Sequence, residues 1–181
     1  MKDLIRMNSA ISQEMLSLLN EQIEIEAQSS ANYLAMASWC NAKGYDNSAD
    51  FLVDQSDEER RHMLKVFQFV NDMGGFAHSP VISKVNHEFD SLRDVFESAL
   101  ESEIKVSNAI NKIVEKARTD KDYRTENFMQ WFVEEQIEEE FVARRAVELF
   151  DLLGEDKLAL FMIDERIPKI KYDKGSPDSG V

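Results

Sequence analysis

The stretch DEERRH at residues 57–62 lies in a segment whose apolar residues recur at helical spacing. Steps of three and four residues place Glu59 and His62 on the same helix face as that apolar stripe. An isolated buried carboxylate costs several kcal/mol even after the surroundings relax. We therefore expect Glu59 to have a compensating partner, and a bound cation is the natural candidate. The apolar members of the stripe are Leu52, Val66, Phe69 and Met73.

A single Glu-x-x-His pair on a helix is usually half exposed and without special role. The pair becomes informative only if other segments carry buried carboxylates at the same depth. The helical periodicity of the rest of the chain therefore decides its meaning.

Four long segments show this periodicity, and no stretch shows the alternation of a β-strand. The segment between the second and third helices is long for neighbours joined by a tight turn. In extended form, at about 3.3 Å per residue, it can cross the length of a helical bundle. The sequence thus predicts an all-α fold, a single-domain four-helix bundle with one long crossover. The expected helices are residues 12–41, 47–73, 91–117 and 123–153, with a short fifth helix at 155–164, an N-terminal arm at 1–10 and a loose tail at 171–181.

Composition narrows the classes of function. The net charge of −14 over 181 residues argues against nucleic acid or an anionic membrane as partner and is compatible with attracting cations. No stretch is apolar enough to cross a membrane, and no secretory signal is expected. Cys40 is the only cysteine, which excludes an internal disulfide and suits a reducing cytoplasm.

Each long helix carries one carboxylate on its apolar stripe, near the middle of the helix. Side by side in a bundle, these four side chains would meet at a common level. Four confined carboxylates without a counter-ion would repel one another or take up protons. Two divalent cations would bring the charge near neutrality, and carboxylates with one imidazole suit iron or manganese better than the thiolate sites of structural zinc. The four residues are Glu26, Glu59, Glu103 and Glu139, with His62 as the nitrogen donor.

The fourth helix lacks a matching histidine. Gln136 stands three residues before Glu139, and the next position at that spacing is Val142. One metal position therefore keeps an imidazole, while the other has carboxylates and a neutral amide. We expect the second position to bind its ion more weakly and to exchange it more readily.

Over about residues 15–165 the chain resembles the bacterial-type non-haem ferritins. The likeness rests on several motifs and spacings that are specific when taken together. They are LNEQ at 19–22 leading to Glu26, Ser29 and Ser30 with Tyr33, EERRH at 58–62, Glu103, and NFMQW at 127–131 leading into EQIEEE at 135–140.

This resemblance implies a di-iron ferroxidase centre. Glu26, Glu59 and His62 would hold the first iron, with Glu59 bridging; Glu59, Glu103 and Glu139 would hold the second, with Gln136 beside it. A third iron site would map to Glu58, Glu135, Glu138 and Glu139. Members of the family assemble as 24-subunit cages, oxidise Fe²⁺ with O₂ or H₂O₂, and store iron as a ferric oxide mineral.

Some assignments stay open at this level. Tyr33 lies one heptad beyond Glu26 and points toward the centre, where it has either a hydrogen-bonding or redox role or that of an ordinary core tyrosine. Glu134 and Glu140 are expected to form a solvated face.

Three other functions are possible for such a bundle. A haem-containing bacterioferritin would have a methionine after the bridging glutamate, where this chain has Arg60, so no haem is expected. A peroxide reductase of rubrerythrin type would need two Glu-x-x-His pairs and a four-cysteine iron domain. A metal-free structural cage subunit is a third alternative, although four interior glutamates would only cost it stability.

Overall fold

Five α-helices form the structure, a computed structural model that describes residue 9 and residues 11–173. The predicted all-α bundle with one long crossover and a short fifth helix is confirmed, and this described part contains no β-strand. None of its helices combines the length and apolar character that a membrane span requires. The elements are α1 (Gln13–Lys43), α2 (Asp46–Asp72), α3 (Leu92–Asp120), α4 (Tyr123–Leu153), α5 (Lys157–Arg166) and the short 3-10 helix η2 (Ile167–Lys169).

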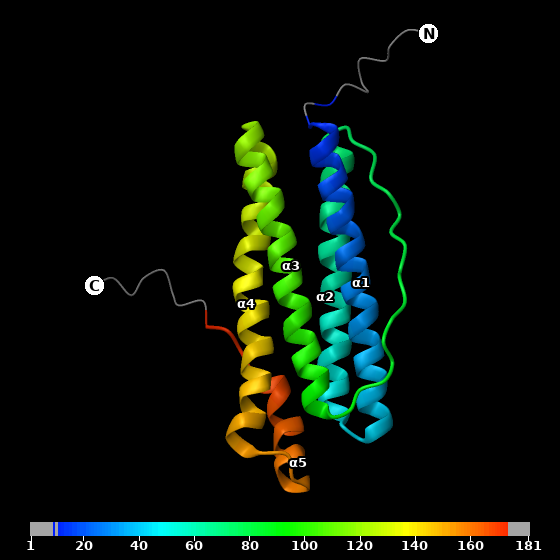
Figure 1. Ribbon diagram of the computed structural model, residues 1–181, viewed down its shortest axis with the longest axis vertical. Helices are drawn as coiled ribbons and strands as arrows, with labels where there is room; N and C mark the ends of the chain where they lie inside the picture. The colour runs from blue at the N-terminus through cyan, green and yellow to red at the C-terminus, as the bar shows by residue number, and fades with distance from the viewer. Residues whose placement is uncertain (1–8, 10, 174–181) are drawn as a thin grey trace, which may run out of the picture.

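The helices pair as two antiparallel hairpins, α1 with α2 and α3 with α4 (Figure 1). The extended segment between α2 and α3 runs along α1 for most of the bundle's length, so α2 and α3 point the same way. Side chains of α1 hold this segment in place. Asn20 accepts a hydrogen bond from the backbone N–H of His78 (2.7 Å), and Gln28 accepts one from that of Ser83 (2.7 Å).

Helix ends follow local chemistry. Ser12 caps α1 by accepting a hydrogen bond from Met15 N–H, and Gly44 ends the helix with a left-handed φ of 84° that favours glycine. The third helix is longer than predicted, because residues 118–120 continue it instead of forming a turn. Lys116 pairs with Asp120 (3.0 Å) in this last turn, and the C-cap residue Lys121, with a φ of 57°, follows the end of the helix.

One residue of each segment predicted to be loose makes a contact at the ends of the described chain. The Ser9 hydroxyl donates a hydrogen bond to the carbonyl of Met73 (2.8 Å), and the Tyr172 ring packs edge-on against Phe141 (5.2 Å between centroids). Residues 1–8 and 10 of the predicted arm and residues 174–181 of the predicted tail lie outside the described residues.

The hydrophobic core consists of two separate clusters. One includes Leu19 of α1 and Val66 of α2; the other includes Met36 of α1 and Leu52 of α2. Each helix of the bundle carries one buried glutamate near the boundary of the two clusters. Glu59, Glu103 and Glu139 lie between the two sets of core residues on their helices, and Glu26 lies beside Ala27, the last α1 residue of the first cluster. The fold therefore places a polar layer across the middle of the bundle.

A carboxylate from α5 caps the N-terminus of α2. Tyr45, at the start of α2, offers no capping side chain, and Asp164 supplies one instead. Its carboxylate accepts hydrogen bonds from the backbone N–H of Ser48 (2.8 Å) and of Asn47 (3.3 Å). This contact ties the short fifth helix to the bundle.

Replacing Asp164 by alanine should leave these N–H groups unpaired. We expect Asp164→Ala to lower the free energy of unfolding by about 1–2 kcal/mol, as loss of a helix cap does. Asp164→Asn keeps an acceptor oxygen and should lose less. Urea denaturation followed by circular dichroism measures both, and equal stability of Asp164→Ala and the unaltered protein would contradict this role.

Candidate metal centre

The polar layer consists of one glutamate from each helix of the bundle. Glu26 and Glu103 are fully buried, Glu59 is 2% exposed and Glu139 is 4% exposed. Carboxylates are almost never buried in this way unless a partner compensates their charge. The layer is thus costly for the fold by itself and points to a ligand.

One group of possible metal ligands joins α1 and α2. A ligand atom from each of Glu26, Glu59 and His62 lies within 4.8 Å of the others. Oε2 of Glu26 and Oε2 of Glu59 are buried and accept no hydrogen bond, while Gln22 donates to Oε1 of Glu26 (2.8 Å). His62 Nδ1 is 3.8 Å from Glu59 Oε2, which is too far for a hydrogen bond. The donor atoms are therefore available to a cation.

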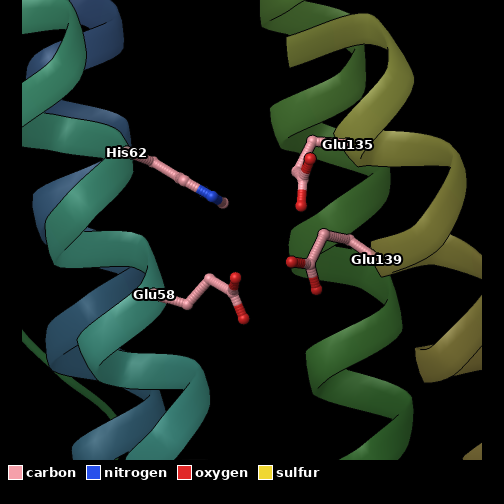
Figure 2. Close-up of side chains that lie close together, drawn as sticks. All are labelled: Glu58, His62, Glu135 and Glu139. Atoms are coloured by element: carbon pink, nitrogen blue, oxygen red, sulfur yellow. The ribbon is translucent and has the colours of Figure 1, made fainter. Parts of the chain in front are cut away.

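A second group joins α2 and α4. Glu58 and His62 of α2 face Glu135 and Glu139 of α4 (Figure 2), and their ligand atoms also lie within 4.8 Å of one another. His62 belongs to both groups. The side chain of Glu58 is 34% exposed and lies near Arg61 (3.7 Å), so this second group is open to solvent where the first is closed.

The His62 ring is held by aromatic neighbours on α4. Trp131 and Phe132 meet it edge-on, with centroid distances of 5.3 and 6.0 Å. These contacts restrict the ring to the space between the two ligand groups. The imidazole is thus positioned by packing rather than by a hydrogen bond.

Glu103 and Glu138 lie outside both groups. The carboxylate of Glu103 instead accepts hydrogen bonds from two side chains: the Tyr33 hydroxyl donates to Oε1, and the Gln136 amide donates to Oε2 (3.2 Å). In the predicted third-iron set, His62 stands where Glu138 was expected. Glu138 is close enough for its charge to raise the pKa of Glu139.

The raised pKa values of the buried glutamates show the electrostatic cost of this layer. Burial raises the pKa of Glu26 well above its ordinary value, and the charge of Glu59 raises it further. The pKa of Glu59 is raised in the same way by burial and then by Glu103. Burial and the charges of Glu103 and Glu58 raise the pKa of Glu139 to about 9. Without cations, Glu139 therefore holds a proton at neutral pH, and burial favours the protonated forms of Glu26 and Glu59.

Glu103 differs from the other three because it has hydrogen-bond donors. Burial raises its pKa, but the hydrogen bonds from Tyr33 and Gln136 oppose that rise. Burial, followed by the charge of Glu103, raises the pKa of Tyr33 well above 10, so the phenol keeps its proton and remains a donor. Tyr33 is therefore a hydrogen-bonding partner of the layer.

The sequence reasoning missed two polar side chains and misjudged a third. Gln22 is fully buried one helical turn before Glu26, a spacing that could have indicated it. Ser107 lies one helical turn after Glu103, and this spacing could likewise have indicated it. Glu140, predicted to lie on a solvated face, is instead partly buried and accepts a hydrogen bond from the Ser107 hydroxyl (2.6 Å). Glu134 is exposed, as expected.

Comparison with known proteins agrees with this geometry. A family model described as a ferritin-like domain matches residues 16–153. A probable bacterial non-heme ferritin-like protein of Haemophilus influenzae is 39% identical over 155 residues, which cover 86% of this chain and 94% of that protein. A bacterial non-heme ferritin of Staphylococcus aureus is 32% identical over 164 residues, which cover 91% and 99%.

Solved structures give the same result. An open pore ferritin of the archaeon Archaeoglobus fulgidus superposes with a TM-score of 0.84 at 39% identity, over 87% of this chain and 96% of that one. An engineered closed form of that ferritin gives 0.84 at 36% identity, over 91% of this chain and 100% of that one. The chain therefore belongs to the ferritin family, and the predicted kinship with bacterial non-haem ferritins is confirmed.

The raised pKa of Glu139 predicts how the stability of the metal-free protein depends on pH. The unfolded carboxyl titrates near 4.5 and the folded one near 9, so the folded state holds the proton more tightly. Stability must then fall as the pH rises from about 5 to about 9. Glu139→Gln removes this loss, and we expect it to raise the free energy of unfolding by about 1–3 kcal/mol at pH 8, with a smaller effect at pH 5.

Thermal denaturation of the metal-free variant and of the unaltered protein, at pH 5 to pH 9, provides the measurement. Glu134→Gln, an exposed change on the same helix, is the control. Parallel curves for Glu139→Gln and the unaltered protein would show that Glu139 does not carry this penalty.

Proposed function

We propose that this protein stores iron. It oxidises Fe²⁺ to Fe³⁺ with O₂ or H₂O₂ at the buried centre and keeps the product as a ferric oxide mineral inside a closed cage of identical subunits. The observation that carries this proposal is the set of buried, unpaired carboxylate oxygens beside His62. Support also comes from the names of its relatives, which are bacterial non-heme ferritins.

Fe²⁺ is the substrate at this centre. Glu26, Glu59 and His62 bind the first ion, and Glu59 bridges to a second ion that Glu103 and Glu139 bind, with Gln136 beside it. Two divalent charges offset the four carboxylates, which relieves the repulsion that raises their pKa values in the metal-free protein. Carboxylate oxygens are hard donors that stabilise Fe³⁺ more than Fe²⁺, so the ligand set itself favours oxidation.

The α2–α4 group serves as a third position, through which iron leaves the buried centre. It shares His62 with the first group and Glu139 with the second ion, so an ion can move between positions without losing all its ligands. The partial exposure of Glu58 connects it to solvent. Glu135 belongs to this set, and Glu138 adds charge at its edge.

Loss of the bridging carboxylate should slow the reaction. Glu59→Gln removes a charge shared by both ions, and His62→Ala removes the one nitrogen ligand. We expect each change to slow rapid Fe²⁺ oxidation at least about tenfold, which corresponds to about 1.4 kcal/mol of barrier. Stopped-flow absorbance after mixing the metal-free protein with Fe²⁺ and O₂ measures the rate.

As a control, Glu134→Gln, which changes an exposed glutamate of α4, should leave the rate of Fe²⁺ oxidation unaltered. Unchanged fast kinetics in Glu59→Gln would remove Glu59 from the centre. Circular dichroism of each variant establishes that the bundle is still folded.

The surface predicts a large assembly. Leu34 on α1 is 52% exposed and Leu64 on α2 is 47% exposed, and together they line one groove. Leu158 and Phe161 expose most of their surface on α5. Apolar areas of this kind mark subunit contacts. Light scattering should give a mass near 24 times the 20.9 kDa of one chain, and a stable monomer or dimer would contradict the cage.

A further inference from the structure

A row of hydrogen bonds crosses from α4 to α3 on the outer side of the centre. The Ser107 hydroxyl donates to Glu140 Oε1 (2.6 Å), and the Gln136 amide donates to Ser107 Oγ (3.3 Å). The same amide nitrogen donates to Glu103, at Oε2 (3.2 Å) and at the backbone carbonyl (3.3 Å). The row therefore links a partly exposed glutamate to a fully buried one.

The direction of these bonds fixes the Gln136 amide. Ser107 has one hydroxyl proton, and giving it to the carboxylate of Glu140 leaves only lone pairs toward Gln136. The Gln136 side chain must then present its NH₂ group to Ser107, because its carbonyl oxygen would meet another acceptor. In this orientation the NH₂ group of Gln136 also donates to Glu103.

Glu103 is fixed in turn. Its Oε1 accepts from Tyr33 and its Oε2 accepts from Gln136, so both oxygens have a donor. Glu26 and Glu59, in contrast, each leave one oxygen unpaired. Of the four glutamates in the layer, Glu103 is thus the one whose place depends on the α3–α4 row.

We propose that Ser107 and Glu140 are positioning residues for the second metal position. They hold the Gln136 amide with its NH₂ group toward Glu103, and so keep the Glu103 carboxylate in place for the second ion. This inference rests on the proposed function, since it concerns the second ion of the same centre. Neither residue contacts an ion itself.

Surface features support a role beyond packing. Ser107, Gln136 and Glu140 line an open cavity of about 420 Å³ between α3 and α4, which also includes Arg144 and Tyr172. The side chain of Glu140 is 30% exposed and also pairs with Arg144 (3.3 Å). Substitution of Ser107 or Glu140 therefore removes hydrogen bonds at the wall of a cavity and leaves the two hydrophobic clusters intact.

Co²⁺ is a suitable probe, because air oxidises it far more slowly than Fe²⁺. Its visible absorption spectrum also depends on its ligands. The metal-free protein is titrated with Co²⁺ without O₂, and the affinities of the first and second ions are taken from the absorbance. We expect Ser107→Ala to weaken the second ion about 3- to 10-fold while the first is unchanged, as loss of one hydrogen bond next to a charged group predicts. Ser107→Thr keeps the hydroxyl and should restore the affinity.

Two matched controls isolate the row. Ser102→Ala changes a partly buried serine of α3 outside the row, and Glu134→Gln changes an exposed glutamate of α4. Neither should affect the second ion. Glu140→Gln should weaken binding of the second ion less than Ser107→Ala does. The glutamine oxygen still accepts the hydrogen bond from Ser107, although more weakly than a carboxylate.

The outcomes separate this inference from the proposed function. Two Co²⁺ ions that bind equally well to Ser107→Ala and to the unaltered protein would overturn the positioning role, and the metal centre would stand. Equal weakening by Ser102→Ala would also overturn it. An unaltered protein that binds no Co²⁺ at the buried centre would refute the proposed function, and this inference with it.

Discussion

The burial of four carboxylates in one layer is the constraint on which the rest of the structure depends. On α2, α3 and α4 the glutamate stands between two stretches of core residues, and on α1 Glu26 lies at the edge of one of them, where the hydrophobic core divides into two clusters. Each cluster holds the four helices together on its own side of the layer. Their packing compensates for the electrostatic cost of the layer and keeps the carboxylates from separating.

The four glutamates do not have the same surroundings. Glu26 and Glu59 have unpaired oxygens and strongly raised pKa values, whereas Glu103 is held by two donors that oppose the rise in its pKa. Burial by itself raises the pKa of all four carboxyls. The polar neighbours of each one therefore set how readily it gives up its proton to a cation. In the proposed centre, this difference would distinguish the two ion positions.

His62 connects the buried half of the centre to its open half. Aromatic packing against Trp131 and Phe132 fixes the ring where it can reach the α1–α2 group and the α2–α4 group. The first group is closed to solvent and the second is partly exposed at Glu58. In the proposed function, a ligand shared between a closed and an open group would allow the site to pass ions on.

The sequence by itself determined the four helices, the crossover, and the layer of Glu26, Glu59, Glu103 and Glu139, because helical periodicity relates each residue to its own helix face. Only the tertiary structure decided which of these side chains meet. Periodicity cannot show that His62 faces Glu135 across the bundle, that Glu103 is turned toward Gln136, or that Glu140 is drawn inward by Ser107. Such contacts depend on the rotation and spacing of helices that are distant in sequence. A shift of about an ångström between two helices is enough to make or break a hydrogen bond between their side chains.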